Sequence, residues 1–309
     1  MAINWYPGHM HKARKEIITA MPNVDLVIEV LDARIPFSSE NPVVAQVRSH
    51  KGNTKPCLKV LSKIDLADPV QTERWCQHFE QEQSVKVLPI TISEDNVAKR
   101  VVAKARALFP DRSKDKAIRA MIMGIPNVGK SSLINVLAGR TIAKVGNEPA
   151  VTKSQQRIDI GDGIILNDTP GILWPKVENP HSAYRLATTG AIKDTAMDYL
   201  DVAFYAAEFL IKTYPELLIQ RYELERIPSN PEQLLDELGS KRGCLRGGGR
   251  VDLNKAATLF IHELRSAQIG HITLETPEMM LEEIAEVARV KEEKEMKDQE
   301  RKSKGKKKR

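Results

Sequence analysis

Segments with the residue types of strands alternate with amphipathic stretches over the first half of the chain. Two of these stretches, 69–83 and 96–108, suit helices, and the second repeats its apolar residues at helical spacing. Strands that alternate with helices predict a mostly parallel sheet with helices on both faces. We therefore expect an α/β fold around six strands, near residues 24–31, 56–61, 85–90, 118–123, 155–160 and 164–166.

From about residue 180 the pattern changes to that of helices alone. Residues 199–214 and 253–264 each carry an apolar stripe, with side chains three or four positions apart. Asn230 followed by Pro231 predicts the start of a helix, and Gly239 can end that helix. This pattern predicts a small all-α domain after the sheet.

Positive charge is concentrated at the end of the chain. The net charge is +6, and residues 291–309 contain 10 Lys and Arg against 5 Asp and Glu. Such a segment suits disorder and contact with phosphate backbones, although a purely solubilising role fits it as well. We divide the chain into an α/β domain at 1–178, a helical domain at 179–290 and a basic, disordered tail at 291–309.

Composition and length are those of an ordinary soluble protein. The 309 residues are 41% hydrophobic, and no apolar run is long enough to span a bilayer. The start of the chain lacks the features of a signal or transit peptide. Cys57, Cys76 and Cys244 have no paired spacing that would indicate disulfides or zinc. We expect a cytoplasmic protein without membrane contact.

A phosphate-binding loop is indicated at residues 124–131, which read Gly-Ile-Pro-Asn-Val-Gly-Lys-Ser. The segment fits G-x-x-x-x-G-K-[ST] and lies between a predicted strand and a predicted helix that Gly139 can end. Lys130 is expected to reach the β- and γ-phosphates, which gives it a catalytic role, and Ser131 is expected to ligate Mg²⁺. The nucleotide contacts expected here are Asn127, Val128, Gly129, Lys130, Ser131 and Ser132.

A second motif, Asp-Thr-Pro-Gly at residues 168–171, follows an apolar run. The carboxylate of Asp168, at the end of a strand, suits an acid on the Mg²⁺ side of the site. The N–H of Gly171 can approach the γ-phosphate because no Cβ intrudes, which adds Gly171 to the expected nucleotide and catalytic contacts. Between the two motifs, Thr152 can lend its hydroxyl to Mg²⁺ when the third phosphate is present and so act as a switch. An ordinary surface threonine is the alternative.

Base choice is indicated by Ser-Lys-Ile-Asp at residues 62–65, which is close to the motif [NT]-K-x-D. Asp65 can accept from two guanine N–H groups, and adenine offers no matching pair of donors. Lys63 would pack its stem along the base. Ser62 stands where asparagine is usual, although a hydroxyl can still bridge loop and base. A base-side loop is expected after the next strand, at Thr91, Ile92 and Ser93.

The base motif precedes the phosphate loop, and this order resembles that of the circularly permuted GTPases. Three strings resemble the ribosome biogenesis GTPase A family (YlqF-type) in particular: Asn-Trp-Tyr-Pro-Gly-His-Met at 4–10, Asp-Ala-Arg-Ile-Pro at 32–36 and Arg-Gly-Gly-Gly-Arg-Val-Asp at 246–252. The resemblance spans residues 4–275. It implies a circularly permuted P-loop GTPase domain followed by a small all-α domain, with GTP or GDP and Mg²⁺ as cofactors.

The resemblance also bears on how water is placed for hydrolysis. Ile172 follows the Asp-Thr-Pro-Gly motif, where many GTPases have a glutamine, and its side chain cannot orient water. The family pattern points to His9 as the catalytic group, since a neutral imidazole can accept from water near neutral pH. Local packing or RNA contact for His9, and a role for His11, stay open. We expect slow hydrolysis by the chain alone and stimulation by the large ribosomal subunit.

Asn127 suggests a monovalent cation as a further cofactor. Related GTPases with asparagine at this loop position bind K⁺ beside the phosphates, where it offsets charge that develops during hydrolysis. The alternative is that Asn127 only shapes the loop. The sequence itself leaves the two roles open.

Basic residues gather around a glycine-rich loop in the helical part. They are Lys241, Arg242, Arg246, Arg250 and Lys255, which we call the basic cluster. A contact with RNA phosphates and a merely solvated loop both fit this pattern. The resemblance favours RNA, because it implies action on the large ribosomal subunit with its rRNA and ribosomal proteins. We expect no DNA partner and a monomer.

The function predicted from these patterns is that of a GTP-hydrolysing assembly factor. It would bind the large ribosomal subunit and promote its late maturation, with the nucleotide state controlling association and release. The alternatives are an RNA-binding scaffold in which the nucleotide is structural, and a P-loop kinase of small molecules. Several motifs agree with the first of these in one unusual order.

Overall fold

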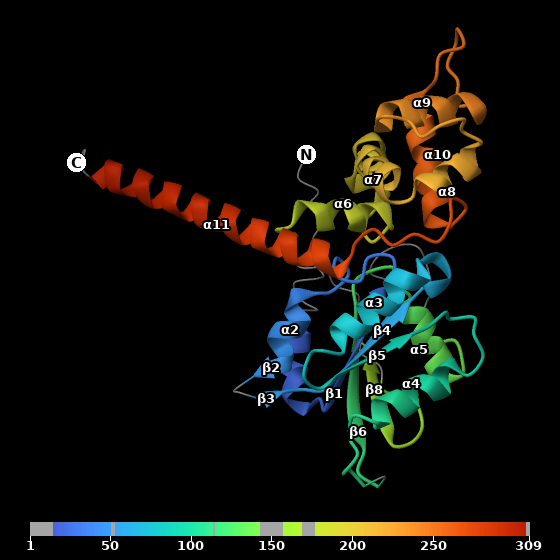
Figure 1. Cartoon of the computed structure of the whole chain (residues 1–309). Coiled ribbons are helices and arrows are strands. Elements are labelled where there is room, and N and C mark those ends of the chain that lie inside the picture. Colours follow the sequence, from blue (N-terminus) through green and yellow to red (C-terminus); the bar gives the residue numbers. More distant parts are fainter. Residues whose placement is uncertain (1–14, 51–52, 114, 143–156, 169–176, 307–309) are drawn as a thin grey trace.

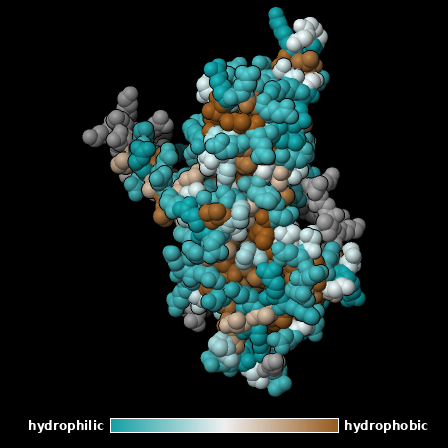
Figure 2. Space-filling view, turned by 45° about the vertical axis from the view of Figure 1, so that its right-hand side comes forward, coloured by the Kyte–Doolittle hydropathy of each residue, from teal (hydrophilic) through white to brown (hydrophobic). Residues whose placement is uncertain are grey.

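The computed structural model describes residues 15–50, 53–113, 115–142, 157–168 and 177–306. A sheet with its helices forms one end of the molecule, a group of short helices forms the other, and a long helix projects from the junction (Figure 1). Figure 2 shows hydrophilic residues over most of the visible face, with several apolar patches among them. Within the described ranges, no helix combines the length and the apolar character that a membrane span requires.

The sheet has the strand order β5-β4-β1-β6-β8-β7. All neighbouring strands run parallel except β7, which is antiparallel to β8. The mostly parallel six-stranded sheet predicted from the sequence is therefore confirmed. Its strands are β1 (Leu26–Asp32), β4 (Cys57–Ser62), β5 (Val85–Pro89), β6 (Ile118–Met123), β7 (Arg157–Asp159) and β8 (Ile164–Asp168), and a separate short pair comprises β2 (Ser49–His50) and β3 (Asn53–Thr54).

The strands β1 and β4 are buried along their whole length, which explains why they read as largely apolar runs. Helices pack against the sheet and complete its core, with Trp75 and Phe79 of α3 among the buried side chains. The α3 helix begins where the sequence predicts it, because Asp68 caps its first turn and Pro69 follows. The helices of this part are α2 (Pro42–Arg48), α3 (Pro69–Phe79), α4 (Val97–Arg106) and α5 (Lys130–Ala138).

The second part consists of helices among the residues that the structure describes. Side-chain oxygens of Asn or Asp cap the N-termini of four of them, and Asn230 does so at the predicted helix start. The α10 helix packs against α7 and α9 through its apolar stripe. These helices are α6 (Pro180–Thr188), α7 (Tyr199–Thr213), α8 (Pro215–Tyr222), α9 (Pro231–Lys241) and α10 (Leu253–Arg265).

Gly239 does not end its helix as expected, because α9 continues to Lys241. A Cβ at Gly239 would lie 2.5 Å from Val251 Cγ1 and 3.1 Å from Ala256 Cβ. The glycine therefore allows the close approach of α9 to the next loop and helix. Sequence pattern alone does not distinguish this role from that of a helix end.

The end of the chain also differs from the expected disordered tail at 291–309. The last helix, α11 (Pro277–Lys306), continues through most of that segment. Alternating Glu and Lys favour helix and can pair at i,i+4 spacing, as Arg289 and Glu293 do at 3.7 Å. Residues 307–309 lie outside the described part of the chain.

Buried charges join the two parts of the molecule. Glu275 accepts from the N–H of Ser38 at 2.9 Å, and Arg185 of α6 lies 3.2 Å from Glu275 and 2.6 Å from Glu283 of α11. Because a broken buried pair leaves an uncompensated charge, this cluster fixes how α6 and α11 meet the sheet. We retain the division at 178/179 as a proposal, with the start of α11 lying against α3 of the first part.

Candidate nucleotide site

The predicted phosphate loop connects β6 to α5 and has the backbone shape that its glycines allow. A Cβ at Gly124 would lie 2.7 Å from Val30 O, so the loop passes too close to β1 for any side chain there. Asn127 and Gly129 adopt left-handed conformations with φ of 62° and 87°. The loop therefore curls at the carboxyl end of β6, where consecutive N–H groups can surround an anion.

The start of α5 provides the positive end of this site. Gly129 has no side chain to cap the first turn, which leaves the amides of that turn to an outside acceptor such as a phosphate. The side chain of Lys130 is buried at this end of α5, and Ser131 and Ser132 are half-buried. These residues stand where the sequence predicts phosphate and Mg²⁺ contacts.

The base motif contacts the phosphate loop directly. Ser62, at the end of β4, has its Oγ 2.5 Å from Val128 O and 2.8 Å from Leu31 O. Lys63 donates from Nζ to Asn127 O at 2.5 Å. The two predicted stretches thus meet in space, and the serine that replaces the usual asparagine makes one of the contacts.

The remaining residues of the base side lie just beyond these contacts. Asp65 is in a 3-10 turn, η2 (Ile64–Leu66), and its carboxylate accepts from Thr91 Oγ1 at 3.1 Å. Asp65 and Ser93 are exposed, and Thr91 and Ile92 are half-buried. The loop after β5 therefore lies against the base motif, as predicted, and the Asp65 carboxylate is accessible to a ligand.

Asp168 lies next to the phosphate loop in the sheet. It is the last residue of β8, and its Cα is paired with Ile122 near the end of β6. This position suits an acid on the Mg²⁺ side of the site, although only the backbone of Asp168 is described. Among the residues that the structure describes, no three His, Cys, Asp or Glu side chains gather as a metal cluster. The predicted residues His9, Thr152 and Gly171, with His11 and Ile172, lie outside the described ranges.

The structure adds Asp32 and Arg34, to which the sequence assigned no role beyond the family resemblance. Asp32 ends β1, between the strands that carry the two motifs, and its carboxylate accepts from Arg34 Nε at 2.9 Å and Nη2 at 2.8 Å. Lys63 Nζ donates to the same carboxylate at 2.9 Å. Burial alone would raise the pKa of Asp32, but the charges of Arg34 and Lys63 outweigh it and hold that pKa well below its ordinary value. A carboxylate at the end of a neighbouring strand is the signal that could have indicated this role.

The phosphate loop and the base motif lie at the carboxyl ends of β6 and β4, with β1 between them. Since the base motif comes first in the chain, this arrangement defines a circularly permuted P-loop GTPase domain. A family model described as 50S ribosome-binding GTPase matches residues 119–223. That match begins at β6 and leaves the base motif outside, as the permuted order requires.

Comparison with curated proteins identifies the family. The chain is 46% identical over 286 residues to ribosome biogenesis GTPase A of Priestia megaterium, covering 90% of this chain and 98% of that protein. It is 32% identical to mitochondrial ribosome-associated GTPase 1 of Mus musculus, with 88% and 89% covered. The chain therefore belongs to the ribosome biogenesis GTPase A family and is a GTPase, which favours this activity over that of a small-molecule kinase.

Solved structures agree with this assignment. The crystal structure of GNP-bound YlqF from T. maritima has a TM-score of 0.62 and 26% identity to this chain, and the match covers 87% of this chain and 99% of that one. The GDP-bound structure of TM YlqF has a TM-score of 0.59 at the same identity. This chain thus shares its overall fold and the binding of guanine nucleotides with these relatives.

Proposed function

We propose that the protein is a GTP-hydrolysing assembly factor that binds the large ribosomal subunit and promotes its late maturation. The observation that carries the proposal is the meeting of Lys63 with the phosphate loop at Asn127 O, which forms one nucleotide site from two distant stretches. The names of the relatives and the description of the matching family model support a role at the ribosome. The nucleotide state controls association and release.

In this proposal the base side of the site selects guanine. Asp65 accepts from two N–H groups of the base, and Lys63 lies along the ring; its hydrogen bond to Asn127 O supports this role because it holds Lys63 beside the phosphate loop. Thr91 already donates to Asp65 and orients its carboxylate, with Ile92 and Ser93 completing the loop. Adenine leaves the Asp65 carboxylate without its donors, so ATP is the poorer ligand.

On the phosphate side, Lys130 contacts the β- and γ-phosphates, and the amides of Gly129 to Ser132 and of Gly171 surround them. Ser131, Thr152 and Asp168 are the proposed Mg²⁺ ligands, which fits two hydroxyls and a carboxylate beside phosphate oxygens. The ion supplies charge neutralisation there when bound. His9 is the proposed group that orients the attacking water once the subunit is bound.

The proposed potassium site involves Asn127, whose amide nitrogen has a hydrogen-bond partner in the structure. Asn127 Nδ2 donates to Gly190 O at 2.7 Å, so the structure gives the amide nitrogen of Asn127 a partner after α6. A K⁺ ion beside the phosphates would use oxygen ligands, including the Asn127 side-chain oxygen. Equal rates of GTP hydrolysis in KCl and NaCl at one ionic strength would exclude the ion.

The basic cluster lies at the end of the helical part that is farther from the sheet, at the end of α9, in the loop between α9 and α10 and at the start of α10 (Figure 1). Two of its members donate to backbone carbonyls, Lys241 to Glu223 O at 2.5 Å and Arg242 to Arg221 O at 3.3 Å. Two others, Arg246 and Lys255, line a cavity of about 520 Å³. Four members of the cluster thus fall into two groups: two cations that brace the fold and two that face a cavity.

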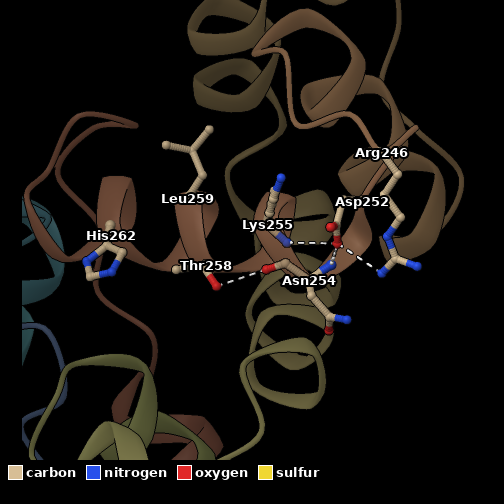
Figure 3. Close-up of a pocket in the computed structure, with 7 residues that line it drawn as sticks. All are labelled: Arg246, Asp252, Asn254, Lys255, Thr258, Leu259 and His262. Atoms are coloured by element: carbon tan, nitrogen blue, oxygen red, sulfur yellow. Dashed lines mark hydrogen bonds and ion pairs between the residues drawn. The ribbon is translucent and has the colours of Figure 1, made fainter. Parts of the chain in front are cut away.

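The cavity suits a nucleotide of an RNA strand. Thr258, Leu259 and His262 follow one another along α10, and Arg246 reaches Asp252 from the loop before the helix (Figure 3). Cations for phosphate, a hydroxyl and the Asn254 amide for sugar or base edges, and an imidazole for stacking are the groups that RNA sites use. We propose that rRNA of the large subunit binds along this side of α10, with the cytoplasm as the compartment and the monomer as the working form.

Sedimentation with purified large subunits tests the function as a whole. We expect the protein to sediment with the subunit in a non-hydrolysable GTP analogue and to stay in the supernatant with GDP. Equal binding in the two nucleotides contradicts nucleotide control, and no binding in any state contradicts the assembly role. Subunit-stimulated release of phosphate from GTP, measured on the same samples, checks that the protein is active.

A further inference from the structure

A buried network of charges and hydrogen bonds leads from the base motif toward the helical part of the molecule. Asp32 Oδ2 is shared, since Arg34 Nη2 donates to it at 2.8 Å and Lys63 Nζ at 2.9 Å. The side chains of Arg34 and Asp32 are each only 3% exposed. Because one oxygen receives both cations, a movement of Arg34 changes the position that Lys63 can occupy.

Arg34 also crosses from the sheet to the helical part. Its Nη1 donates to Arg265 O at 3.1 Å, at the last residue of α10, and Nη2 lies 3.5 Å from Thr189 O after α6. The guanidinium thus donates to both parts of the molecule at once: to the Asp32 carboxylate and to backbone carbonyls of the helical part. A lysine offers a single ammonium group in place of this planar fork.

A second connection starts at the phosphate loop and ends at the same place. We call residues 187–190 the α6 end turn. Asn127 Nδ2 donates to its Gly190 O at 2.7 Å, and Arg265 donates to Thr188 O at 2.9 Å and Ala187 O at 2.8 Å. The turn is therefore held by the phosphate loop and by the end of α10.

We propose that Arg34 is a positioning residue for guanine binding: it holds Asp32 so that Lys63 is oriented for the base, and it ties that orientation to the α6 end turn and α10. The proposal rests on the guanine role proposed above for residues 62–65. This link differs from a γ-phosphate switch at Gly171 because it depends on whether guanine is bound. It therefore applies to GDP as well as GTP. Lys255, which lines the cavity, lies ten residues before Arg265 on α10, a distance of about 15 Å along the helix.

Two measurements on the full chain test this role of Arg34. We expect Arg34→Lys to weaken binding of fluorescent GDP by about tenfold, a loss typical of one charge-assisted hydrogen bond. The turnover of bound GTP at saturation should change much less, which separates positioning from chemistry. Amide hydrogen exchange of residues 187–190 should slow on GDP binding in the wild type, and that slowing should be lost in Arg34→Lys even at saturating GDP.

Arg119→Lys is the matched control, since Arg119 also pairs with an aspartate, Asp25, at 3.1 Å but is the second residue of β6, at the end of that strand away from the phosphate loop. It should keep wild-type GDP affinity and the slowing of exchange. A second variant, Arg265→Lys, keeps the carbonyl that Arg34 contacts while removing the donors to Ala187 and Thr188. It should bind GDP within about twofold of wild type and still lose the slowing at the α6 end turn.

The possible results distinguish a failure of the proposed guanine site from a failure of the proposed role of Arg34. If the wild type does not bind GDP, the proposed guanine site itself is wrong. If GDP binds but Arg34→Lys matches the wild type in affinity and exchange, Arg34 has no positioning role. If Arg34→Lys does not fold by circular dichroism, Arg265→Lys decides, because unchanged slowing in that variant overturns the link between base and helical part.

Discussion

The carboxyl edge of the sheet and the loop between α9 and α10 both present cations, but they hold them in opposite ways. At the sheet edge, Arg34 and Asp32 are each 3% exposed and form a bidentate pair that Lys63 joins. In the loop, Arg246 is 57% exposed and has Asp252 as its paired carboxylate. The same chemical groups are fixed in one region and adaptable in the other.

This difference fits the two kinds of ligand that we propose for the two regions. A small nucleotide is recognised by a few groups in a fixed geometry, so burial and shared hydrogen bonds are an advantage at the sheet edge. A long polyanion such as RNA is bound largely through release of counterions, for which exposed cations suffice. The contrast predicts that substitutions in the first region affect chemistry and stability, while those in the second affect salt-dependent binding.

The largest effect is expected for Lys130→Ala at the sheet edge. Removing this buried cation, which we propose contacts the phosphates, should lower GTP hydrolysis by roughly 100-fold or more, since such electrostatic groups act most strongly in the transition state. Phosphate release under single-turnover conditions measures it. Full subunit binding and complementation by this variant would instead support the scaffold alternative, in which nucleotide serves structure.

A smaller effect, on stability, is expected for Asp32→Asn. The asparagine amide keeps one acceptor oxygen but no negative charge, so Arg34 and Lys63 lose the charge that they share, which should cost about 3 kcal/mol of unfolding free energy at neutral pH. Urea denaturation measures it. Asp252→Asn, at the exposed pair, is the matched control and should change the midpoint much less.

The pH dependence of this variant has a definite sign. The pKa of Asp32 is lower in the folded protein than in the unfolded chain, where it is about 3.9. The contribution of Asp32 to stability is therefore complete above its unfolded pKa, and it is lost as the pH falls through the lower pKa of the folded protein. The stability gap between wild type and Asp32→Asn should stay constant from neutral pH to about pH 4 and narrow below it. A gap that closes already near pH 6 would contradict this account.

The smallest effect is expected in the exposed region. Replacing Arg246 and Lys255 together by glutamine should weaken subunit binding by about tenfold and reduce the slope of log affinity against log salt by about 1 to 2. Lys212→Gln is the control, because Lys212 is an exposed cation of the same helical part, paired with Glu208. Equal loss in the control would show that the surface acts only through net charge.

Local patterns explain what could be predicted before the structure. The glycine and lysine spacing of residues 124–131 requires a curled loop before a helix, and Asn230-Pro231 requires a helix start, so both were found from sequence. Gly239 and the end of α11 were assigned wrongly. A glycine that permits close packing and one that ends a helix look alike in sequence, and a charged segment can be a solvated helix as well as a disordered tail.

By itself the sequence determined the elements, their order and the two nucleotide motifs, because each depends on neighbours within a few positions. Only the tertiary structure decided that Ser62 and Lys63 touch the phosphate loop and that Asp32 and Arg34 belong with them. Arg34 meets the carbonyl of Arg265, 231 positions away. Such a contact follows from the order of strands in the sheet and from how α10 docks on it, and no local spacing encodes either.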